Sequence, residues 1–324
     1  MSAENASTTA VGTAGPGSTR VRRDRCPGVL RPWPADDGLL VRLRLIGGHV
    51  PISALRRLLE VSHEYGDGRI RVTGRANLQL RALPRAAGGD PVGRLPERVL
   101  RAIEATGLLP TRSHELVRNV MVSPQTGLAG GRADLRPIAA QLEAALCARP
   151  RLAALPGRFL FVLDDGRGDL LERTGDLGLV ALDPATAQLR IGEGFGAPVP
   201  LSGAAAALAD LAVAFLDQRG EGPQAAWHIV ELTAPQQESL GSGHPADARL
   251  PVPIGPLAFG EVPGGVHLQV TANGMDDDAL SELESVAAGR SAAEVVVTPW
   301  RGILVPGRTP DTTAPTTGMT GATR

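Results

Sequence analysis

The sequence predicts an α/β protein in which two copies of one small unit flank a different α/β segment. Shifting Gly38–Leu80 by 225 positions places its apolar pattern on Pro263–Val305 without a gap. Val41, Leu43 and Leu45 then fall on Val266, Leu268 and Val270. A repeat this regular indicates one supersecondary unit used twice.

The spacing of apolar residues changes in step along each copy. In the first copy, residues 39–45 alternate as a strand, 52–64 repeat every three or four as a helix, and 69–73 and 77–82 alternate again. Each copy is therefore predicted to be a strand–helix–strand–strand unit. Because so small a unit is marginal alone, we expect the two copies to pair into one sheet.

The segment between the copies, about 95–245, alternates helices and strands and is expected to be an α/β domain. Its predicted elements are a helix near 137–148, strands at 159–163, 177–182 and 188–191, and a helix at 202–218. The stretches 84–94 and 233–250 are predicted to be linkers. The expected division is a disordered leader (1–24), first copy (25–94), α/β domain (95–245), second copy (246–307) and disordered tail (308–324).

Composition excludes several classes of function. The chain has 324 residues and a net charge of −1, which argues against a nucleic-acid binder. Its apolar runs are shorter than the roughly 20 residues that span a bilayer, and no hydrophobic signal core opens it, so a cytoplasmic protein with no membrane partner is expected. Two cysteines, Cys26 and Cys147, cannot build a disulfide framework or a four-thiolate site, so no metal ligands are predicted.

All 33 basic residues are arginine, a bias that GC-rich coding also explains, so only the placement of particular arginines is informative. In the first copy, one face of the predicted sheet is polar because strand side chains alternate. Its members are Arg42, Arg44, Arg69, Arg71, Thr73, Asn77, Gln79 and Arg81. The matching positions of the second copy hold His267, Gln269, Glu294 and Leu304. A solvated outer face is one interpretation; a bound polyanion is the other, since clustered guanidiniums repel one another.

Five blocks, in order along the chain, resemble the sulfite/nitrite reductase superfamily and, within it, the precorrin-3B synthases. These blocks are RCPGVLRP (25–32), TGRANLQLR (73–81), VRNVMVSP (117–124), LPGRFLFVLDD (155–165) and TPWRGILVPG (298–307). The resemblance implies two ferredoxin-like half-domains around an α/β domain. It also implies an oxidoreductase that hydroxylates and lactonises a precorrin, a tetrapyrrole of aerobic cobalamin biosynthesis, with electrons from a donor protein.

The resemblance also implies roles for particular residues. Arg75 matches the anion-contacting arginine of the family's T-x-R motif, Arg118 matches the arginine of its R-N pair, and Arg158 stands where its L-P-R-K-F strand has the lysine. These three are the predicted catalytic residues. Leu160 stands where sulfite reductases have a second basic residue, which disfavours sulfite as substrate. The residues expected to bind substrate or cofactor are Arg71, Asn77, Gln79, Arg81 and Asn119. Arginine suits this role because it binds carboxylates in a fixed plane.

The family holds a [4Fe-4S] cluster, beside sirohaem or another iron centre, through C-x5-C and C-x3-C motifs that this chain lacks. Three hypotheses follow. The chain is a synthase truncated by a frameshift or gene-model error, an iron-free tetrapyrrole-binding module, or a structural subunit completed by a cysteine-bearing partner. The activity of the chain alone stays open.

Four other features have ordinary structural interpretations. Cys26 precedes a Pro-Gly turn and is expected to be a small buried residue, and Cys147 is expected in the core. Gly192–Gly196 does not follow the G-x-G-x-x-G pattern of dinucleotide-binding loops. His228 is expected to be a core histidine rather than a ligand.

Overall fold

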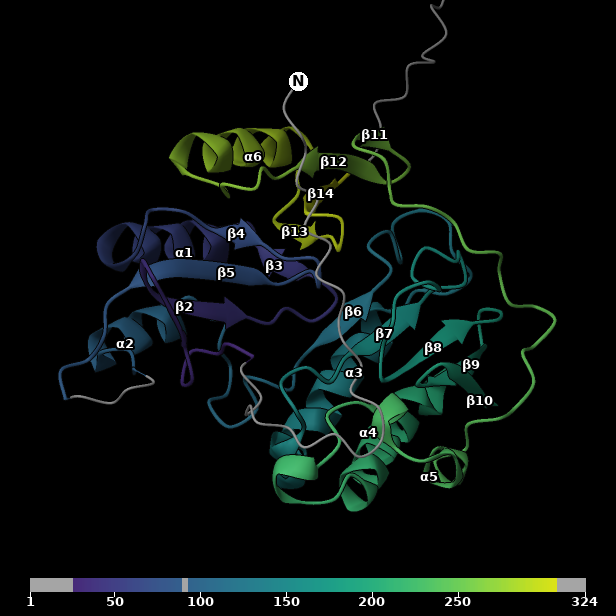
Figure 1. Ribbon diagram of the computed structural model, residues 1–324. Helices are drawn as coiled ribbons and strands as arrows, with labels where there is room; N and C mark the ends of the chain where they lie inside the picture. The colour runs from purple at the N-terminus through teal and green to yellow at the C-terminus, as the bar shows by residue number, and fades with distance from the viewer. Residues whose placement is uncertain (1–25, 89–92, 308–324) are drawn as a thin grey trace, which may run out of the picture.

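A computed structural model describes residues 26–88 and 93–307, and it contains three sheets (Figure 1). One sheet belongs to the first copy, one to the α/β segment, hereafter the central domain, and one mainly to the second copy. The predicted leader and tail lie outside the described residues. The fold is the expected one, with two half-domain copies beside a central α/β domain.

The first copy forms an antiparallel sheet of order β1-β2-β5-β4, and one helix covers it. Its strands are β1 (Trp33–Ala35), β2 (Gly38–Leu43), β4 (Arg71–Val72) and β5 (Leu78–Leu83), and its helix is α1 (Ile52–Tyr65). The helix buries Leu55, Leu58 and Leu59, which recur on one face at helical spacing. These leucines meet the buried alternate residues of β2 and β5 in one core.

The central domain has a five-stranded sheet of order β10-β9-β8-β7-β6, in which β6, β7 and β8 are parallel. Helices α3 (Arg136–Cys147) and α4 (Leu201–Gln218) pack on one face of it. In Figure 1 both lie beneath the teal strands. The strands are β6 (Val120–Val122), β7 (Phe161–Asp164), β8 (Leu177–Ala181), β9 (Thr186–Ile191) and β10 (Gly194–Pro200).

Helix α4 is long and apolar enough to cross a bilayer. Its residues Leu208, Ala212 and Phe215 are buried in the core shared with α3 and the sheet. It is therefore placed as the core helix of this domain.

The second copy completes a sheet of order β11-β12-β14-β13-β3. Its own elements are β11 (Gly260–Val262), β12 (Gly265–Gln269), α6 (Asp277–Gly289), β13 (Glu294–Val297) and β14 (Gly302–Pro306). The fifth strand, β3 (His49–Pro51), comes from the first copy. Asp276 begins α6 by accepting a hydrogen bond from the amide of Ala279, as a capping aspartate does.

The two copies are related by a pseudo-two-fold axis. Val50 pairs with Val295, and their repeat equivalents Met275 and Ile70 pair in turn. Helices α1 and α6 pack side by side across the axis (Figure 1). The expectation of one shared sheet was wrong: each copy keeps its own sheet, and they exchange an edge segment and share one core.

A backbone feature is repeated as well. Ala76 and Arg301, equivalent under the repeat, both have left-handed φ angles, 55° and 60°. Non-glycine residues rarely take this conformation, which costs about 1 kcal/mol or more. The turn before the last strand is therefore built in the same strained way in both copies.

Two segments differ from the sequence-based expectation. The predicted linker 233–250 contains a helix, α5 (Ala234–Ser239), which a Thr233–Gln236 capping box begins. Helix α2 (Glu97–Ala105) was not predicted, and it packs into the core of the first copy through Val99 and Ile103. Gly192 and Glu193 form the hairpin turn between β9 and β10, and Gly194–Gly196 begin β10. The exact domain boundaries stay a prediction.

Candidate anion-binding site

The turn between β4 and β5 projects Arg75 toward the central domain. Thr73 Oγ1 accepts hydrogen bonds from the amides of Arg75 (3.4 Å) and Asn77 (3.2 Å), which fixes the turn. The Arg75 Nη1 atom donates to the backbone carbonyl of Arg158 at 3.0 Å. The Arg158 guanidinium lies over the Trp227 ring, 5.4 Å from its centroid. Two predicted residues, Arg75 and Arg158, are therefore brought together.

A row of polar side chains crosses the sheet of the first copy beside this turn. Arg71 and Arg42 are the strand neighbours of Gln79 on either side. Arg42 donates to Gln79 Oε1 at 3.3 Å, and its Nε atom is buried without a hydrogen-bond partner. Burial lowers the pKa of Arg42, and the nearby charge of Arg75 lowers it further. Neither Arg42 nor Arg75 has a carboxylate partner among the described residues.

Most of the other arginines on this face are already neutralised, which sequence reasoning missed. Arg71 is ion-paired with Asp67 at 2.6 Å, Arg81 with Asp37 at 3.0 Å, and Arg69 with Asp276 at 3.2 Å. The sequence holds a signal for one of these pairs, since Asp67 precedes Arg71 by four residues. The cationic face is therefore narrower than expected: among the described residues, Arg42 on this face and Arg75 in the adjoining turn are the arginines here without a carboxylate partner.

Arg44 is a structural residue rather than a part of this face. It is 3% exposed, and its guanidinium donates to the backbone carbonyls of Pro27, Glu115 and Gly157. Burial lowers its pKa to about 10. A single side chain thus ties the start of the described chain to two segments of the central domain.

The predicted R-N pair divides between two environments. Asn119 accepts a hydrogen bond from Asn77 at 3.1 Å and donates to the carbonyl of Phe159 at 3.1 Å, so these two amides join β5 to the start of β7. Arg118 is ion-paired with Glu143 of α3 at 2.5 Å. Its other hydrogen bond is to the carbonyl of Arg44. Arg118 therefore makes no contact with Arg75 or Arg158.

Arg118 instead lines a cavity of about 390 Å³ between the first copy and α3. His49, Arg136, Glu143 and Glu294 also line it. The cations here have acidic neighbours: Arg136 pairs with Asp134, and His49 lies 3.5 Å from Glu294. This cavity is therefore lined by both cations and carboxylates. It is less suited to binding an anion than the region of Arg42 and Arg75 is.

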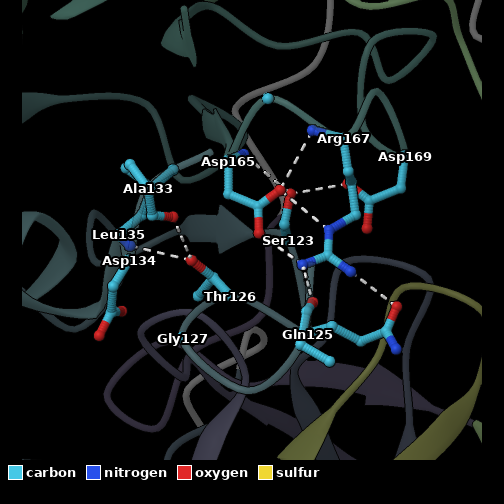
Figure 2. A network of polar contacts seen from close by, with 12 residues as sticks. Ser123, Gln125, Thr126, Gly127, Ala133, Asp134, Leu135, Asp165, Arg167 and Asp169 are labelled. Carbon is cyan, nitrogen blue, oxygen red and sulfur yellow. Dashed lines mark hydrogen bonds and ion pairs between the residues drawn. The ribbon is translucent and has the colours of Figure 1, made fainter. Parts of the chain in front are cut away.

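An acidic cluster stands at the carboxyl end of β7, where carboxylate oxygens of Asp164, Asp165 and Asp169 lie within 4.8 Å of one another. Figure 2 shows Asp165 and Asp169 of this cluster beside Arg167 and Ser123. Each carboxylate has partners within the chain. Asp164 accepts three backbone amides, Asp165 pairs with Arg167, and Asp169 accepts from Ser123 Oγ at 2.7 Å. Burial and the charge of Asp164 raise the pKa of Asp169 to about 7. We interpret the cluster as a self-satisfied structural network.

The chemistry of the thiols does not fit an iron–sulfur cluster. A [4Fe-4S] cluster takes four thiolates, and this chain has two cysteines. Cys26 lies near the first copy's arginines, whereas Cys147 lies on α3, where burial raises the pKa of its thiol. The residues present therefore do not hold the cluster, while the guanidiniums of Arg42 and Arg75 suit a carboxylate ligand.

Comparison with known proteins places this geometry in a class. Residues 34–87 match the model of the Nitrite/Sulfite reductase ferredoxin-like half domain. The match covers β1 to β5, the elements that carry Arg42 and Arg75. The first copy is therefore similar to this half domain, and the fold repeats the same unit in the second copy.

Two particular proteins share parts of this chain. A precorrin-3B synthase from Sinorhizobium sp is 33% identical over 147 residues, which is 45% of this chain and 29% of that protein. The structure of the Mycobacterium tuberculosis NirA protein superposes with a TM-score of 0.59 at 18% identity. That superposition covers 87% of this chain and 59% of NirA, so it establishes the fold. This chain spans less than two thirds of either protein.

Proposed function

We propose that this chain acts in the precorrin-3B synthase step of aerobic cobalamin biosynthesis, an oxidative hydroxylation and lactonisation of a tetrapyrrole. Its part is to bind the carboxylates of the macrocycle on Arg42, Arg75 and Arg158. The similarity to the Sinorhizobium synthase supports the pathway. Electrons would come from a donor protein, as the family resemblance implies.

The observation that carries the proposal is the pair of cations without carboxylate partners. A half-buried guanidinium without a counter-ion loses hydration and gains little in return, so Arg42 and Arg75 are costly to the folded protein when no ligand is bound. A carboxylate bound between them would restore charge-assisted hydrogen bonds. The Nε atom of Arg42 is buried without a hydrogen-bond partner, which adds to the cost of the unliganded state.

The two-cysteine composition favours a second candidate, an iron-free tetrapyrrole-binding protein that works with a cysteine-bearing partner. Both candidates use the same arginines. They differ in the redox step, for which this chain's thiols do not supply the cluster ligands.

Binding of uroporphyrin III, a tetrapyrrole with eight carboxylates, to the full chain tests the proposal. Arg75→Ala should weaken binding about 10- to 100-fold, since a hydrogen bond to a charged group contributes about 1.5–3 kcal/mol. Arg81→Ala is the matched control, because Arg81 lies on β5, the strand that follows the Arg75 turn, but is paired with Asp37. Equal affinities of Arg75→Ala and the wild-type protein would refute the proposed role.

A further inference from the structure

The turn that carries Arg75 is repeated in the second copy, and there it carries Trp300. The amide of Thr73 donates to the carbonyl of Asn77 at 2.9 Å, and the amide of Thr298 donates to that of Gly302 at 2.9 Å. The two backbones are therefore matched residue for residue. The same position that presents a guanidinium in one copy presents an indole in the other.

These two turns meet at the pseudo-two-fold axis. A Cβ atom on Gly74 would lie 3.9 Å from the carbonyl oxygen of Pro299, which is the equivalent of Gly74 in the second copy. Arg75 and Trp300 directly follow these two residues. The guanidinium and the indole therefore arise from adjacent backbone on opposite sides of the axis.

A second pair of equivalent positions shows the same exchange. Arg42 of the first copy corresponds to His267 of the second. The His267 ring lies edge-on to Trp300, with centroids 6.3 Å apart, and Phe259 stacks on its other side at 4.5 Å. Burial lowers the pKa of His267, which favours the neutral imidazole. Two cations in one copy are thus replaced by two uncharged rings in the other.

The surroundings are fitted to the aromatic pair. His267 Nε2 is hydrogen-bonded to Thr298 Oγ1 at 2.9 Å, and its Nδ1 to the carbonyl of Ala258 at 3.0 Å. A Cβ atom at Gly302 would lie 2.2 Å from His267 Nε2. The first copy has Asn77 at that place, so the glycine makes room for the ring that braces Trp300.

Trp300 packs beside the cationic site. It contacts the small apolar cluster of Met121, Leu160, Val162 and Leu170 on the sheet face opposite α3 and α4. Leu160 is two residues beyond Arg158, whose carbonyl accepts from Arg75. The indole is half-buried, so part of it stays accessible. The axis therefore separates a cationic half from an apolar, aromatic half.

We infer that Trp300 is a specificity-determining residue, which binds the ring of a planar, largely apolar ligand while the arginines hold carboxylates along one edge. The inference rests on the proposed function and adds the reason why a macrocycle, rather than any small polycarboxylate, would be selected. Stacking of a planar ring on an aromatic side chain is favourable and tolerant of ring substituents.

Two probes separate the two halves of the site in the full chain. Uroporphyrin III has both a ring and carboxylates, whereas citrate has carboxylates only. Trp300→Leu, which keeps an apolar group against Leu160, should weaken uroporphyrin III binding about tenfold and change citrate binding less than twofold. Trp300→Phe should retain most of the uroporphyrin affinity, and Trp33→Phe, on the distant strand β1, should retain all of it.

Each outcome decides one claim. If Arg75→Ala weakens the binding of both probes but Trp300→Leu weakens the binding of neither, the proposed carboxylate site stands and the inference about Trp300 is overturned. If Arg75→Ala changes the affinity for neither probe, the proposed function itself is refuted. Equal losses of citrate and uroporphyrin in Trp300→Leu, with an unchanged melting temperature, would assign Trp300 to shaping the arginine turn and would also overturn its role in ring selection.

Discussion

Arg75 of the first copy and Arg158 of the central domain are joined by a 3.0 Å hydrogen bond from the Arg75 guanidinium to the Arg158 backbone carbonyl. This bond uses one N–H donor of Arg75. Because the acceptor is an uncharged carbonyl, the bond does not neutralise the guanidinium. The guanidinium carbon of Arg158 meanwhile lies 5.4 Å from the centroid of the Trp227 ring. Arg75 is thus positioned by the fold without a carboxylate partner among the described residues, which is the state expected of a site that binds an anion.

Removing Arg44 should destabilise the protein. Arg44→Ala leaves three buried carbonyls without their donor, and we expect the free energy of unfolding to fall by about 2–4 kcal/mol. Arg101→Ala, at a side chain that is 75% exposed, should change it by less than about 0.5 kcal/mol. Urea unfolding of the two variants measures both values. A similar, small effect in the two would show that Arg44 does not tie the domains together.

Asp169 should make stability fall as the pH rises from about 4 to about 7. Its pKa in the folded protein is about 7, above the value of about 3.9 in an unfolded chain, so the folded state holds the proton within this window and the unfolded state does not. The stabilising effect is complete below the unfolded pKa and is lost above the folded one. Asp169→Asn keeps the contact with Ser123 and should remove this part of the slope.

Urea unfolding at pH 5 and pH 7.5 compares the wild-type protein with Asp169→Asn. The difference in unfolding free energy between the two pH values should be smaller in the variant by about 1–3 kcal/mol. If the unfolding free energy depends on pH in the same way in both proteins, a group other than Asp169 takes up the proton.

The ion pairs between α1 and α6 should couple the two copies weakly. Arg56 contacts Glu284 at 2.6 Å and Asp277 at 3.1 Å across the pseudo-two-fold axis. A double-mutant cycle of Arg56→Ala and Glu284→Ala should give a coupling energy of about 0.3–1 kcal/mol at low salt. The coupling should shrink in 1 M salt, where the screening length is about 3 Å. A salt-independent coupling would contradict an electrostatic origin.

The duplicated unit was predictable because its cores depend on local periodicity. Leu55 and Leu58 recur on one face of a helix, and Leu78 and Leu80 on one face of a strand, whatever their partners are. The exchange of β3 into the other sheet was not predictable, since pairing Val50 with Val295 requires knowledge of which edges meet in space. The local pattern of apolar residues therefore predicts the helices and strands, but it does not predict which strands pair with one another.

The site was predictable in part for the same reason. Strand alternation placed Arg42, Arg71 and Gln79 on one face, and the structure has them in one row. Alternation carries no information on which arginines meet a carboxylate. Asp37 and Asp67 lie in turns, and their folding back onto Arg81 and Arg71 depends on turn geometry. Trp227 joins the site from far along the chain, and no local pattern marks it.

The most direct test of the account is a structure of the full chain with uroporphyrin III bound. The account predicts that carboxylates of the porphyrin lie against Arg42 and Arg75, at the junction of β4, β5 and the start of β7. A porphyrin bound instead in the cavity lined by His49, Arg118 and Arg136, with Arg42 and Arg75 untouched, would contradict the central claim.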